Sequence, residues 1–150
     1  MSILSQLNGL PDENLKRFVA VLNEKIEVGR LFNALGHMAA GITSSVGEMS
    51  PLLFLQYRDK DGGLHPNISH YPFIVLKAEN SNQIRKLRAE LMSQELPYTD
   101  FTRAMIAGSS KGQLTETEAL PELEQEYFGV CFFGDTEALK PLTKRFSLFR

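Results

Sequence analysis

The chain contains one cysteine, no tryptophan and three histidines among 150 residues. Cys131 by itself cannot form an internal disulfide, and the histidines lack the spacing of a metal finger. We therefore expect no metal and no cofactor. No apolar run approaches the roughly 18 residues of a membrane span, and the first residues lack the basic and then apolar layout of a signal peptide. These absences predict a cytoplasmic protein without membrane attachment.

A basic excess is also missing. Sixteen basic and eighteen acidic side chains give a net charge of −2, and the pI is near 5.9. Because phosphate contacts supply most of the affinity for nucleic acid, this balance disfavours tRNA as a partner. Hydrophobic residues at 43% and charged residues at 23% are typical of a globular chain. The length suits one domain, which we expect over residues 17–150, after a leader or short packed helix over residues 1–16.

The apolar patterns predict alternating strands and helices. Strands are expected over residues 17–23, 52–58, 73–78, 98–102 and 127–133, and helices over residues 28–46, 80–95 and 136–140. Turn residues at 59–63 predict a hairpin-like excursion, and the prolines predict an irregular connection over 65–72. This order favours an α/β fold, a mixed β-sheet with helices on both faces.

One segment has a less regular pattern. Residues 103–126 are rich in Gly, Ser, Thr and Glu and show little apolar periodicity, which is typical of a segment that is either functional or loose. In the helix expected at 80–95, the apolar side chains face inward, whereas Arg85 and Arg88 are predicted to face water.

The helix expected at 28–46 carries the first candidate site. Arg30, Asn33 and His37 share one polar strip, beside a flank of small residues that includes Gly29 and Gly36. Imidazole titrates near neutral pH, so His37 is a candidate base, with Arg30 as an anion clamp and Asn33 as an orienting amide. The alternative is a solvated helix side whose histidine binds a neighbouring loop.

Asp100 is the second candidate. It lies at the end of a short predicted strand, between Thr99 and Thr102, and a carboxylate with adjacent hydroxyls can orient a water molecule or a ligand hydroxyl. Sites of open α/β sheets lie at strand ends. The alternative is that Asp100 caps a turn and that the threonines only fill strand positions.

Several motifs resemble those of an uncharacterised bacterial family, known only as a domain of unknown function, that is similar in fold to the type II peptidyl-tRNA hydrolases. The motifs span residues 21–25, 33–38, 70–77, 82–85, 100–102, 126–129 and 141–148, and the likeness extends over about residues 17–150. It implies the α/β fold of those hydrolases. Among their active-site positions, the resemblance matches His37, Lys77 and Asp100.

The match to the hydrolases themselves is incomplete. Arg30 replaces a lysine and Ala34 replaces a glutamine, with Asn33 one position away. We therefore interpret the chain as a possible hydrolase that acts on an ester or another small anionic substrate. In this hypothesis His37 or Asp100 activates water, Arg30 and Lys77 hold the anionic group, and Asn33 and Thr102 bind substrate. The alternative is a non-catalytic ligand-binding or regulatory module that acts as a homodimer.

Overall fold

The central strand of the protein is formed by the apolar run that follows Lys16. A computed structural model describes residues 5, 7–46 and 53–150, and in it β1 (Lys16–Asn23) pairs in parallel with β4 (Phe73–Ala78) and antiparallel with β6 (Tyr127–Asp135). The edges are β5 (Tyr98–Thr102), beside β6, and β7 (Ser147–Leu148), beside β4, so the strand order is β5-β6-β1-β4-β7. The predicted mixed sheet is confirmed.

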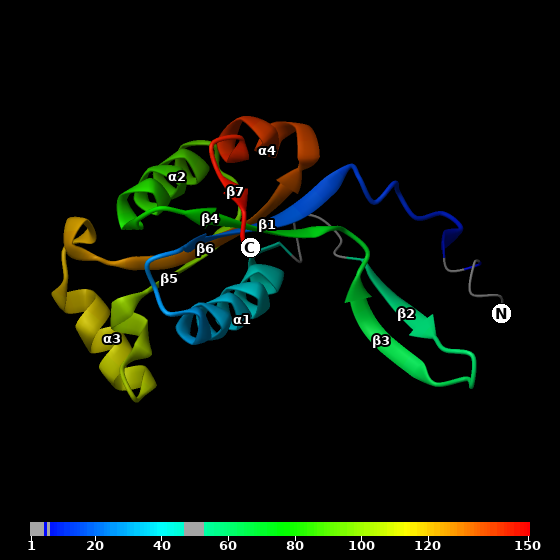
Figure 1. Cartoon of the computed structure of the whole chain (residues 1–150), viewed down its shortest axis with the longest axis horizontal. Helices are drawn as coiled ribbons and strands as arrows, with labels where there is room; N and C mark the ends of the chain where they lie inside the picture. Colours follow the sequence, from blue (N-terminus) through cyan, green and yellow to red (C-terminus); the bar gives the residue numbers. More distant parts are fainter. Residues whose placement is uncertain (1–4, 6, 47–52) are drawn as a thin grey trace.

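Helices cover both faces of this sheet (Figure 1). The helix α1 (Val28–Val46) lies on one face, and α2 (Ser81–Ser93) and α4 (Thr136–Thr143) lie on the other. The Asn80 side chain accepts a hydrogen bond from Gln83 N at 3.0 Å and so caps the start of α2. No helix in the described ranges has the length and hydropathy needed to cross a membrane.

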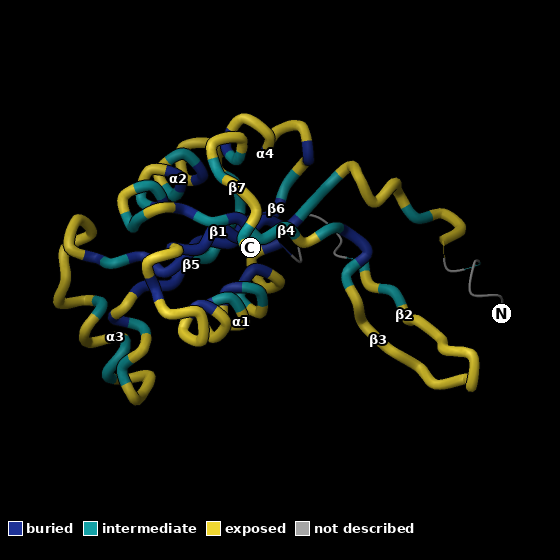
Figure 2. Tube along the Cα trace, viewed as in Figure 1, coloured by how far each residue is buried: buried dark blue, intermediate teal, exposed yellow. Residues whose placement is uncertain are grey.

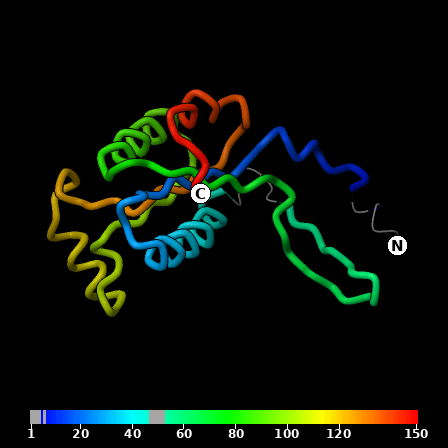
Figure 3. The backbone as a smooth tube through the Cα atoms, viewed as in Figure 1, coloured from blue at the N-terminus to red at the C-terminus, as the bar shows by residue number. Residues whose placement is uncertain are grey.

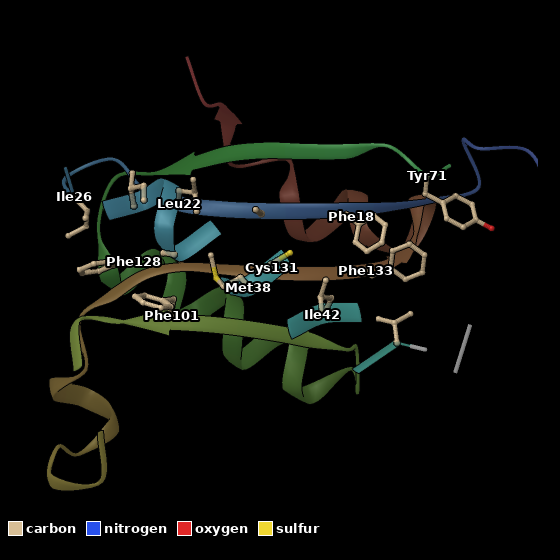
Figure 4. Packing of buried hydrophobic residues seen from close by; sticks show 14 residues of the cluster. Phe18, Leu22, Ile26, Met38, Ile42, Tyr71, Phe101, Phe128, Cys131 and Phe133 are labelled. Carbon is tan, nitrogen blue, oxygen red and sulfur yellow. The ribbon is translucent and has the colours of Figure 1, made fainter. Parts of the chain in front are cut away.

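The alternation of side chains along β1 creates two separate cores. Phe18, Ala20 and Leu22 pack on the α1 face, and alternate side chains of β6 join them there, namely Phe128, Cys131 and Phe133 (Figure 4). Val19 and Val21 pack on the opposite face against α2 and α4. Because β1 is buried on both faces, its sequence is a continuous apolar run rather than an alternating one.

A two-stranded ribbon projects from the sheet domain (Figures 1 and 3). It consists of β2 (Phe54–Arg58) and β3 (Leu64–Ser69), which confirms the hairpin. The irregular connection expected at 65–72 is confined to residues 70–72, because residues 65–69 belong to β3. Leu52, where the strand expected at 52–58 was predicted to begin, lies outside the described residues. Pro66 is tolerated in β3 because the pairing is irregular there, and Asn67 has a φ of 61°.

The segment from residue 103 to residue 126 is ordered rather than loose. It forms the 3-10 turn η2 (Arg103–Ile106), the helix α3 (Ser110–Ala119) and the turn η3 (Glu122–Glu124). No residue of α3 is buried, and much of the segment is exposed in Figure 2. The spacing of apolar residues did not predict α3, because this helix has no apolar face toward the core.

The leader is tied to the domain near its end. Pro11 O accepts a hydrogen bond from His70 Nε2 at 2.8 Å, and Asn14 O accepts one from Thr136 Oγ1 at 2.6 Å. The first strand already begins at Lys16, one residue before the expected boundary of the domain.

Candidate functional site

The polar strip of α1 is open to solvent. Arg30 and Asn33 line a depression of about 470 Å³ together with Glu27, Gly29 and Ile106. Arg30 Nε lies 3.8 Å from Oε2 of Glu27, the residue before α1, so its charge already has a partner. The structure thus brings Arg30 and Asn33 together, but beside a carboxylate that repels an anionic ligand.

His37 and Lys77 make other contacts. The His37 ring stacks on Phe101, with 5.7 Å between ring centroids and 26° between their planes. Lys77 Nζ lies 3.2 Å from Glu24 Oε2. Neither side chain lines the depression around Arg30, so the expected anion clamp of Arg30 and Lys77 is not assembled there.

Asp100 faces the other side of the sheet. Its Oδ2 accepts a hydrogen bond from Arg88 Nε of α2 at 2.6 Å, whereas the next residue, Phe101, packs in the core on the α1 face. The sheet therefore separates Asp100 from His37. The two candidate catalytic groups are not brought into one site.

A pocket of about 270 Å³ does lie beside Asp100, between β5, α2 and the segment 103–126. We call it the Thr102–Gln125 pocket, and its lining residues are Arg88, Asp100, Thr102, Met105, Thr117, Leu120, Glu122, Gln125 and Tyr127. Two of the predicted site residues, Asp100 and Thr102, thus meet in one cavity. Its outer wall is formed by the segment whose role the sequence left open.

Two buried polar atoms in this pocket lack a hydrogen-bond partner. Within the described part of the chain, Thr102 Oγ1 and Gln125 Oε1 are the only buried side-chain oxygen or nitrogen atoms in this condition. Thr102 is 3% exposed and Gln125 is 8% exposed. A buried polar group without a partner costs about 1–3 kcal/mol, so each of these two atoms would gain free energy from a polar partner, either water or a ligand.

The rest of the Gln125 side chain is anchored. Its Nε2 donates to Thr117 O at 3.1 Å and to Leu120 O at 3.3 Å. Both contacts are to carbonyl oxygens, which only accept, so the amide orientation is determined and Oε1 is the atom that remains free. The same amide holds the end of α3 against the site.

The charged groups around the pocket are paired. Arg85 Nε donates to Glu122 Oε1 at 3.1 Å, and Tyr127 Oη donates to the same oxygen at 2.8 Å. Burial, together with this hydrogen bond to Glu122, raises the pKa of Tyr127 above its ordinary value. Burial lowers the pKa of Arg88, but the hydrogen bond to Asp100 and the electrostatic attraction of the Asp100 carboxylate and nearby tyrosines together outweigh burial, so the pKa is raised. Arg88 therefore stays charged.

Sequence reasoning missed most of this pocket. Arg85 and Arg88 were predicted to face water, yet their side chains are only 17% and 25% exposed because the segment 103–126 and β5 cover them. No sequence pattern marked Gln125 as a site residue, since a single glutamine in a polar segment does not stand out. Across the described residues, no group of three or more His, Cys, Asp or Glu side chains is placed to hold a metal ion.

The fold and this pocket define an α/β protein with a small, partly polar cavity on one side of its sheet. The chain belongs to the DUF2000 family of proteins of unknown function, whose model matches residues 16–150. A solved structure of the protein of unknown function Atu0240 from Agrobacterium tumefaciens strain C58 is similar, with a TM-score of 0.77 and 18% identity. The match covers 90% of this chain and 98% of that one. No curated protein matches the chain.

Proposed function

We propose that this protein is a small-molecule binding module whose ligand occupies the Thr102–Gln125 pocket. The observation that carries the proposal is the pair of buried oxygen atoms, Thr102 Oγ1 and Gln125 Oε1, that line one cavity without a hydrogen-bond partner. A ligand that bonds to both would recover the free energy that their burial costs. Paired charges and apolar side chains from Met105 and Leu120 complete a lining typical of small-molecule sites.

The contacts of the histidines and the cysteine support binding rather than hydrolysis. His37 stacks on Phe101, His65 contacts Asp59 at 3.3 Å, and His70 contacts the Pro11 carbonyl. None of these contacts is the nucleophile–histidine pair that covalent hydrolysis requires. Burial raises the pKa of Cys131 to about 12, so its thiol is protonated at neutral pH.

A hydrolase with a fold like that of the type II peptidyl-tRNA hydrolases is the second candidate. It is supported by the sequence resemblance and by the depression that Arg30 and Asn33 share on α1. In that case a small anionic substrate would bind on the α1 face, with His37 as the base.

Cytoplasmic location and a homodimer remain proposals from the sequence. The homodimer is supported by the projecting ribbon, where Phe54, Leu64 and Ile68 are each at least half exposed. A two-stranded ribbon alone is marginally stable in water, so contact with a second copy would stabilise it.

The two candidates are separated by one set of measurements on the wild type, Thr102→Val and His37→Ala. We expect NMR titration with pools of small amides, polyols, amines and carboxylates to shift the signals of pocket residues in the wild type and less in Thr102→Val. We expect no hydrolysis of p-nitrophenyl acetate or peptidyl-tRNA. Hydrolysis by the wild type that is lost in folded His37→Ala would instead establish the second candidate.

A further inference from the structure

We propose that the Thr102–Gln125 pocket selects an uncharged ligand that donates a hydrogen bond from an N–H or O–H group, and that it rejects anions. The inference rests on the proposed function and adds the chemical class of the ligand. It differs from the small anionic substrate that the sequence predicted.

The first argument is the polarity of Gln125. Both amide hydrogens are committed to the Thr117 and Leu120 carbonyls, so the group offered to the cavity is the acceptor Oε1. A carboxylate or a fully ionised phosphate has only acceptor oxygens and would meet this oxygen with repulsion. A ligand N–H or O–H group is the complement.

The second argument is the hydroxyl group of Thr102, which lines the same pocket as Gln125 Oε1. The Thr102 hydroxyl is buried and free, and a hydroxyl can donate or accept. A primary carboxamide satisfies both positions, because its NH₂ group donates to Gln125 Oε1 while its carbonyl accepts from Thr102 Oγ1. A polyol with adjacent hydroxyls fulfils the same requirement.

The third argument is charge. The lining contains the carboxylates of Asp100 and Glu122, and each is already paired, with Arg88 and with Arg85 respectively. In these pairs the carboxylates cancel the attraction that the guanidinium groups would otherwise exert on an anion. The two guanidinium groups cancel the attraction that a cation would otherwise find. Balanced charges leave hydrogen bonding as the basis of selection.

The fourth argument is size. A cavity of about 270 Å³ is at the small end of ligand sites, which usually span about 300–1,000 Å³. Met105 and Leu120 contribute apolar surface to it. The pocket therefore suits a compact molecule with one polar end and a short apolar body.

A matched series tests the class of ligand. Isobutyramide, isobutyrate and isobutylamine share one carbon skeleton and differ in charge and donor capacity. We expect NMR titration of the intact protein to give a dissociation constant for isobutyramide about tenfold lower than for the other two. We expect Thr102→Val to weaken isobutyramide about fivefold. Thr99→Val, on the opposite face of the same strand, is the control and should bind it as the wild type does.

Each other outcome has a distinct meaning. Equal or tighter binding of isobutyrate or isobutylamine at the pocket overturns the ligand class and leaves a binding function in place. If neither this series nor the wider pools shift pocket signals, the proposed function itself is wrong and solvent alone satisfies the two oxygen atoms. If Thr102→Val does not fold, Thr102→Ser, which keeps the hydroxyl, and Thr102→Ala, which removes it, replace it as a matched pair, and equal affinity in these two overturns the role of the hydroxyl.

Discussion

His37 and Asp100 lie on opposite faces of the central sheet. His37 stacks on Phe101, and Asp100, the preceding residue of β5, accepts its hydrogen bond from Arg88 on α2. Successive side chains of a strand point to opposite faces, so consecutive residues of β5 serve two different environments. A proton cannot pass between His37 and Asp100 in one reaction step, because the packed sheet lies between them.

The free hydroxyl of Thr102 should affect stability in an unusual direction. We expect Thr102→Val to leave the free energy of unfolding unchanged or to raise it by up to about 1 kcal/mol, because the substitution removes a buried oxygen atom without a partner. Urea denaturation of the ligand-free protein measures this.

The control is the neighbouring threonine on the other face. Thr99 Oγ1 donates to Met38 O at 2.9 Å, so Thr99→Val should lower the free energy of unfolding by about 1 kcal/mol. If both variants lose the same amount of stability, Thr102 Oγ1 has a partner in solution and the main support for the binding site is removed.

Substitution by alanine should change the stability of the protein in opposite directions at two glycines. A Cβ atom at Gly129 would lie 2.8 Å from Leu22 Cδ2 and 3.0 Å from Val21 O, so we expect Gly129→Ala to cost about 1–3 kcal/mol. At Gly36 on α1 a Cβ atom would meet no heavy atom within 4 Å. Gly36→Ala should therefore stabilise the protein by about 0.5–1 kcal/mol through helix propensity. Thermal melts of the two variants measure both effects, and a loss of stability in Gly36→Ala would mean that another chain packs on this side of α1.

The Arg103–Glu126 ion pair should make stability depend on pH. The hydrogen bond from Arg103 lowers the pKa of Glu126 below its ordinary value of 4.5. The unfolded chain then binds more protons than the folded one as the pH falls toward and below that value, so acid weakens the folded state. We expect the urea midpoint to fall less in Glu126→Gln than in the wild type between about pH 6 and about pH 3.5.

The matched control is Glu118→Gln on the exposed surface of α3, which also removes one carboxylate but leaves the Arg103 pair intact. It should keep the acid sensitivity of the wild type. An identical pH dependence of all three proteins would contradict the assigned role of the pair.

Small residues illustrate how far the sequence could be interpreted. Gly29 and Gly36 are correctly placed on one side of α1, but a Cβ atom at either would meet only open space. Segments distant in sequence approach other glycines closely, for example Gly41, beside Thr99, and Gly129, beside Leu22 and Met38. Helical spacing tells which residues share a side, whereas the contact partner of that side depends on segments distant in sequence.

The sequence by itself determined most strands and helices of the sheet domain and their layering, although it did not predict β3 or α3. Period-3.6 spacing places α1 at Val28–Val46, and continuous apolar runs place β4 and the buried part of β6, because these patterns reflect local geometry and burial. Only the tertiary structure decided which polar groups meet. It separates Asp100 from His37 through strand alternation, and it joins Asp100 and Thr102 to Gln125 because the end of the segment 103–126 returns beside α2, where Arg85 donates to Glu122 and to the Gln125 carbonyl. Such encounters depend on pairing between distant segments, which no local pattern in the sequence encodes.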